Sequence, residues 1–184
     1  FIVAIFIFVY GLAFANEIIL IIFGQKFYLA ITALQTLIWV VPIIFLTSLF
    51  GNIMNAINKQ RLVTIVAASN AVFNVVLNLI LIPKYSFIGA SIATVLTELL
   101  GFILMFYYIS KYHFRVSIKN SIILPVVNGA LVLGLIYYFK TFNWIIAGFI
   151  GVLFYLVLLY AMKIIDKDDI KLLKEILPIG DKND

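Results

Sequence analysis

Side-chain amides recur along one predicted helix of this 184-residue chain, and a single carboxylate lies in the apolar run that follows it. Asn70, Asn74 and Asn78 are spaced at i, i+4 and i+8, so they share one face of a helix. An unpaired amide in hydrocarbon costs several kcal/mol, so this face must point at protein or at water. Hydrogen bonds between helices, worth about 0.5–2 kcal/mol each, and the wall of a polar cavity both fit the pattern.

The carboxylate is Glu98, and it shares its side of the predicted helix with Ser91 and Thr94. An ionisable group near mid-bilayer costs at least about 2.5 kcal/mol on insertion scales, so Glu98 is predicted to face the protein interior. Two roles fit. It is either a protonation switch or hydroxyl acceptor at a cavity wall, or a structural tie to Asn70 or Asn74.

The elements that position these residues are predicted to be membrane-spanning helices. The chain is 65% hydrophobic and 11% charged, with a mean hydropathy of +1.20, which leaves too few polar groups to cover a water-facing surface. Continuous apolar runs favour helices over a barrel. We expect an all-α polytopic bundle with six spans, at about 1–23, 33–57, 62–82, 87–109, 121–139 and 144–163.

Within these spans, prolines and small residues predict local geometry. Pro83 is predicted to end the third span, while Pro42 and Pro125 predict kinks in the second and fifth. In the fourth span small residues recur every four positions, a face that lets another helix approach closely. Its members are Gly89, Ala93, Thr97 and Gly101.

Loop charges predict the orientation. Lys59 and Arg61, and then the loop from Lys111 to Lys119, carry more positive charge than the alternate loops, which places them in the cytoplasm. Both ends of the segment then lie inside, and the tail at 164–184 is predicted to contain a short amphipathic helix on the membrane surface. The basic residues are spread singly, which argues against nucleic acid as a partner.

Enzymatic chemistry is poorly supported by the sequence. The chain has no cysteine, and its one histidine, His113, lies in a basic loop. Paired carboxylates, a glycine-rich phosphate loop and a Ser-His-Asp set cannot be assembled from it. We therefore expect neither a catalytic centre nor a metal or cofactor site, but a conduit or binding cavity.

Two stretches carry a resemblance. "ILIIFGQKFYLAITALQTL" (Ile19–Leu37) and "NAVFNVVLNLILIPKYSFIGASIATVLTE" (Asn70–Glu98) resemble the C-terminal half of polysaccharide-repeat-unit flippases of the multidrug/oligosaccharidyl-lipid/polysaccharide exporter superfamily. The similarity covers roughly residues 16–110, and the fifth and sixth spans match in hydropathy only. Ser86 departs from the pattern, because a glycine usually follows the aromatic residue in that turn.

The resemblance implies a transporter of twelve to fourteen helices in two lobes around a central cavity, with this segment as most of the second lobe. It implies that lipid-linked oligosaccharide, of the undecaprenyl pyrophosphate type, is moved across a bacterial cytoplasmic membrane by alternating access for lipopolysaccharide, capsule or other surface polysaccharide biosynthesis. The chain opens inside an apolar run without Met, which predicts a missing N-terminal lobe. That lobe is expected to supply the cationic residues that these spans lack.

Three alternatives stay open. One is a cation-coupled multidrug exporter of the same superfamily, and another is a membrane enzyme of polysaccharide assembly, although that would need large loops with catalytic side chains. The third is a scaffold without transport activity.

Overall fold

The computed structural model describes residues 1–111 and 122–162, and within these ranges the chain is helical without strands, which confirms the predicted all-α class. The loop around His113 and the tail at 164–184, with its predicted surface helix, lie outside the described residues. The chain divides into two compact units, Phe1–Ser117 and Ile118–Asp184.

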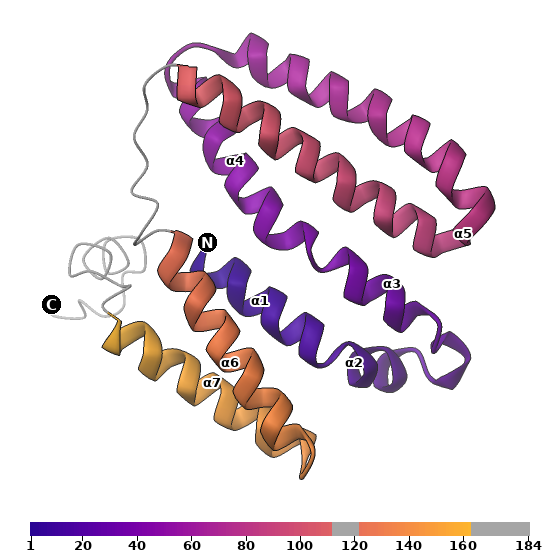
Figure 1. Cartoon of the computed structure of the whole chain (residues 1–184), viewed down its shortest axis with the longest axis vertical. Helices are drawn as coiled ribbons and strands as arrows, with labels where there is room; N and C mark the ends of the chain where they lie inside the picture. Colours follow the sequence, from indigo (N-terminus) through magenta and orange to yellow (C-terminus); the bar gives the residue numbers. More distant parts are fainter. Residues whose placement is uncertain (112–121, 163–184) are drawn as a thin grey trace, which may run out of the picture. The chain divides into compact units, whose positions relative to one another are not determined.

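The first unit begins with three short helices, the second and third separated by a single 3-10 turn, and continues with two longer helices (Figure 1). Its elements are α1 (Ile2–Ala13), α2 (Ala15–Ile22), η1 (Gln25–Phe27), α3 (Ala30–Leu37), α4 (Val40–Ala56) and α5 (Gln60–Lys111). The second unit is a helical pair, α6 (Leu124–Lys140) and α7 (Trp144–Ala161).

Several of these helices are long and apolar enough to cross a membrane. By length and composition, Ala30–Ala56, Gln60–Lys111 and Trp144–Ala161 qualify, and the bent pair α1–α2 qualifies if counted as one span. α6 is apolar but shorter. The predicted first and second spans therefore correspond to α1–α2 and α3–α4, the third and fourth to α5, and the fifth and sixth to α6 and α7.

Both of the first two spans are interrupted. α1 and α2 meet at Phe14 with a bend of 71°. α3 and α4 are separated at Ile38–Trp39, one turn before Pro42, which has no N–H to offer the Ile38 carbonyl. That carbonyl accepts from the Val41 N–H instead, at 3.1 Å.

The interruptions lie against each other. Ile38 packs directly on the backbone of Gly11, so a methyl group at position 11 would overlap its side chain. The Phe8 and Trp39 rings make an edge-to-face contact at 4.7 Å between centroids. The two broken spans of the first unit thus cross where each is broken.

The core of the first unit is completed where α4 packs on α5. Phe50 and Met54 of α4 are buried against Val66, Met105 and Ile109 of α5. The Phe50 ring also stacks on Phe102, at 5.8 Å. This cluster fixes which side of α5 faces α4.

In the second unit, Pro125 lies in the first turn of α6, where a proline needs no partner for its missing N–H. The helix then runs uninterrupted to Lys140, and Ile122 and Ile123 directly before it are π-helical, so any irregularity that Pro125 introduces lies at the start of α6. At the other end of the pair, Asn143 caps α7 by accepting from the N–H groups of Ile145 and Ile146.

Candidate functional site: the polar hairpin of α5

α5 is a hairpin of two antiparallel helical arms, although its helical geometry is broken at one residue only (Figure 1). The break is Ser86, with φ 52° and ψ −135°. We call residues 60–85 the first arm and residues 87–111 the second arm. The first arm continues past Pro83, where the sequence predicted its end. Pro83 removes one hydrogen bond but has a helical φ, so the reversal waits for Ser86.

The predicted asparagine face lies between the two arms. The Asn78 side-chain N–H donates to Asn74 Oδ1 at 2.8 Å, and the Asn74 side-chain N–H donates to Thr97 Oγ1 at 3.2 Å. The Thr97 hydroxyl in turn donates to the Ala93 carbonyl at 2.8 Å. These bonds form a directed ladder that joins the arms and fixes the orientation of two amides.

The small residues of the second arm face the same interface. Gly101 lies against the Asn70 amide, and Gly89 lies against the backbone of Leu81, with its ideal Cβ position 2.6 Å from the Leu81 carbonyl carbon. A side chain at either position would overlap its neighbour. The asparagines of the first arm and the small residues of the second arm, which the sequence predicted as separate faces, therefore form the two sides of one contact.

The ladder leaves acceptors unused inside the hairpin. Asn70 Oδ1 and Asn78 Oδ1 are buried, and neither has a hydrogen-bond partner in the described part of the chain. Each is an amide oxygen with capacity for a donor. Asn78 is oriented by its bond to Asn74, and the Asn70 amide lies against Gly101.

Glu98 lies on a different side of the second arm. It follows Thr97 by one residue, so its side chain points about 100° away from the ladder. Ser91, Glu98 and Met105 are seven residues apart and share a face, and Met105 packs against α4. The half-buried Glu98 therefore points to the side of the hairpin that α4 covers.

The structure does not join Glu98 to the asparagines. The Asn74 amide donates to Thr97, and Asn70 Oδ1 has no partner in residues 1–111 or 122–162. The two hydroxyls on the Glu98 side donate within their own helix, Ser91 to the Phe87 carbonyl at 3.1 Å and Thr94 to the Ala90 carbonyl at 3.0 Å. Their oxygens still have capacity to accept.

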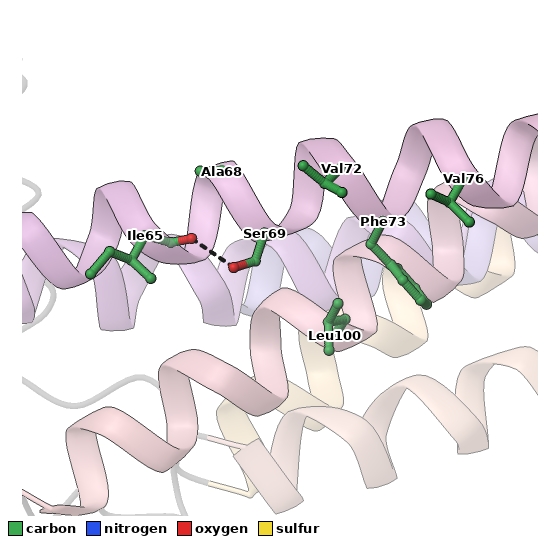
Figure 2. A pocket seen from close by; sticks show the side chains of 7 residues that line it. All are labelled: Ile65, Ala68, Ser69, Val72, Phe73, Val76 and Leu100. Carbon is green, nitrogen blue, oxygen red and sulfur yellow. Dashed lines mark hydrogen bonds between the residues drawn. The ribbon is translucent and has the colours of Figure 1, made fainter.

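One side of the hairpin carries an apolar groove of about 630 Å³, formed mostly by the first arm and completed by Leu100 of the second (Figure 2). It is lined by Ile65, Ala68, Ser69, Val72, Phe73, Val76 and Leu100. Ser69 is its one polar lining residue, and its hydroxyl donates to the Ile65 carbonyl at 2.9 Å. The first arm is therefore polar where its asparagines face the second arm and apolar where it lines this groove.

The second unit contains a polar residue that the sequence reasoning missed. Asn128 of α6 is completely buried, its amide donates to the Tyr155 carbonyl of α7 at 3.5 Å, and its Oδ1 has no partner among the described residues. A lone amide within the apolar run around it was the available signal. In the described residues, no three His, Cys, Asp or Glu side chains gather to hold a metal ion.

Comparisons with known proteins agree with a membrane location. The chain is 29% identical over 164 residues to an uncharacterized membrane protein of Methanocaldococcus jannaschii, which covers 86% of this chain and 32% of that protein. It is 31% identical over 149 residues to the probable low-salt glycan biosynthesis flippase Agl15 of Haloferax volcanii, which covers 78% of this chain and 31% of that protein.

The chain spans about a third of the length of these curated relatives. No family model matches it, and no solved structure matches it. The apolar helices and the relatives together identify a multi-pass membrane protein that is similar to a glycan flippase.

Proposed function

We propose that this chain is the C-terminal lobe of a transporter that flips lipid-linked glycan across the cytoplasmic membrane, and that it is not an enzyme. The observation that carries the proposal is the similarity to the Haloferax volcanii flippase. That match covers 78% of the chain, so at most about 40 of 184 residues lie outside it. A continuous match of that length includes all of α5.

The chemistry of α5 fits such a substrate. Sugars present many hydroxyl donors, and the hairpin holds two buried amide oxygens, Asn70 Oδ1 and Asn78 Oδ1, without donors of their own. A rearrangement of the arms that admits hydroxyl groups would satisfy both. Asn74 has a different role in this proposal, because its bonds hold the ladder together.

Glu98, with Ser91 and Thr94 beside it, would then act on the face toward α4 as a protonation switch or a hydroxyl acceptor. The full protein would carry a second lobe and work by alternating access. In a bacterium the carrier would be undecaprenyl pyrophosphate and the product a surface polysaccharide. We place both ends of this segment in the cytoplasm.

Glu98→Gln in the full-length protein tests this role. The substitution keeps the shape of the side chain but removes its ionisable proton. We expect normal abundance of the protein in the membrane and a reduction of surface glycan by about tenfold or more. A tenfold reduction corresponds to the loss of about 1.4 kcal/mol of interaction between Glu98 and the substrate or proton. Surface glycan is measured in a strain whose own gene for this protein is deleted and which expresses the variant. Immunoblots of the membrane fraction measure the abundance of the variant.

Ser69→Ala is the matched control, because Ser69 lies in the apolar groove and its hydroxyl bonds only its own helix. It should leave export unchanged. Full export by the Glu98→Gln protein at every pH would eliminate the protonation switch. If deleting the whole gene altered drug resistance and left surface glycan intact, the multidrug exporter would replace the flippase.

Orientation is tested separately, since the chain has no cysteine of its own. Single cysteines at positions 86 and 113 are exposed to a membrane-impermeant thiol reagent in intact cells. We expect labelling at 86 and not at 113. The reverse pattern would invert the proposed topology.

A further inference from the structure

The segment between the first two spans exposes apolar side chains where the backbone is irregular. Residues 21–29, here called the elbow, follow the 71° bend between α1 and α2. Six of its side chains are between 53% and 67% exposed. They are Ile21, Ile22, Phe23, Phe27, Tyr28 and Leu29. Little else in the first unit covers them.

The elbow turns because Gly24 adopts φ 81°, a conformation that other residues rarely reach. The turn is closed by the Phe27 N–H, which donates to the Gly24 carbonyl at 3.1 Å, and by contact of the Phe23 and Phe27 rings at 6.0 Å. The N–H groups of Gln25 and Lys26 have no carbonyl partner in the part of the chain described. These groups need water or polar headgroups.

Two physical requirements then restrict where the elbow lies. Its apolar side chains form a patch of the kind that soluble surfaces rarely expose, so they are unfavourable in bulk water. Its free backbone N–H groups are unfavourable in the hydrocarbon core, where irregular backbone exposed to lipid does not occur. The boundary between headgroups and acyl chains satisfies both requirements.

Charge supports the same location. Lys26 is the only charged residue between Glu17 and Lys59, and its side chain is exposed at the tip of the turn. A lysine beside aromatic residues can bury its stem and extend its ammonium to the interface. The elbow has no acidic residue, so its electrostatic preference is for anions.

We propose that the elbow is a docking element for the phospholipid surface of one leaflet, with its aromatic and aliphatic side chains inserted at the headgroup–acyl boundary and the Lys26 ammonium at lipid phosphates. This surface is separate from the polar hairpin, and the inference stands whether or not the chain belongs to a flippase.

The test places a single nitroxide spin label at Phe27→Cys in the full chain, reconstituted in vesicles of phosphatidylcholine and phosphatidylglycerol. Oxygen concentrates in the membrane and a nickel chelate stays in water, so the ratio of their effects on the relaxation of the spin label reports the depth of the label in the membrane. We expect the label about 5–10 Å below the headgroup surface. Gln60→Cys, at an exposed helix start, provides the aqueous reference, and Leu153→Cys, exposed at the middle of α7, provides the deep reference.

Lys26→Gln tests the charge. The label at position 27 should lie deeper in vesicles that contain phosphatidylglycerol than in phosphatidylcholine alone, and Lys26→Gln should abolish that difference. Lys84→Gln, another exposed lysine at a chain reversal, should preserve it. The proposal would be overturned if the label at position 27 were as accessible to nickel as the label at position 60. It would also be overturned if the label at position 27 were shielded from both reagents, because protein would then cover the elbow.

Discussion

The α5 hairpin and the α6–α7 pair are built on the same spacing but filled with different side chains. In the second arm of α5 the buried residues recur every four positions from Gly89 to Ile109, and in α7 they recur every four from Ala147 to Leu159. Both stripes begin with small residues. The facing helix differs, because the first arm of α5 offers asparagines and α6 offers mostly aliphatic side chains.

The difference separates packing from polarity. The α6–α7 pair shows that small residues every four positions bring two helices together with only one buried amide between them. The polar ladder of α5 is therefore more than this geometry requires. The α6–α7 pair buries one unpaired amide oxygen, whereas α5 buries two beside a ladder of hydrogen bonds between its arms, and this surplus directs attention to α5 as the site.

The largest expected effect comes from Gly89→Ala. The added methyl would overlap the backbone of Leu81, which cannot rotate away, so the arms must separate. We expect a loss of about 1–3 kcal/mol in the free energy of unfolding, the usual range for overpacking. Denaturation of the purified protein in detergent micelles measures it.

Gly134→Ala, in α6, is the matched control because its Cβ would meet nothing within 4 Å. It should be neutral or stabilise the helix by about 0.5–1 kcal/mol. Equal losses of unfolding free energy in the Gly89→Ala and Gly134→Ala proteins would show that close backbone approach does not distinguish the α5 hairpin from the α6–α7 pair.

A smaller effect is expected from Asn74→Leu, which removes two hydrogen bonds of the ladder and leaves the Asn78 amide without its acceptor. At about 0.6 kcal/mol for each bond, the unfolding free energy should fall by about 1 kcal/mol. Asn128→Leu should cost less, since its one bond is long and its oxygen is already unpaired. A greater loss at Asn128 would reverse the comparison.

Effects of similar size to that of Asn74→Leu, with opposite signs, are expected at the two turns. Ser86→Gly should stabilise the α5 hairpin by about 1 kcal/mol, because glycine adopts a positive φ without strain. Asn143→Ala should destabilise the α6–α7 pair by about 1 kcal/mol through loss of the α7 cap. Thermal unfolding of both variants measures these changes, and a destabilised Ser86→Gly protein would contradict the strain at Ser86.

Hydropathy was sufficient to predict the all-α class, since continuous apolar runs admit few other folds. The interruptions were harder to see. Pro42 signalled the break at Ile38–Trp39, but the break lies a turn earlier because the proline frees the carbonyl four residues before it. No proline marks the bend at Phe14. The contact near it, between Gly11 and Ile38, joins residues that are far apart in the sequence, so the sequence could not reveal it.

The candidate site was visible in parts. The asparagine stripe and the small-residue stripe each follow from spacing, but spacing within one helix does not reveal how that helix is rotated toward the next. Contact between Asn70 and Gly101 depends on that rotation. The side of Glu98 was predictable relative to Ser91 and Thr94, whereas its position facing α4 depends on where Phe50 and Met54 pack.

The backbone contact between Gly89 and Leu81 also restricts how the molecule can move. Two packed helices can shear, sliding along each other by an ångström or two while side chains adjust. At Gly89 no side chain lies between the backbones, so none is there to adjust as the arms slide past each other. Shear is therefore disfavoured at this contact, and we expect a rearrangement that opens the hairpin to proceed by rotation about its turn at Ser86.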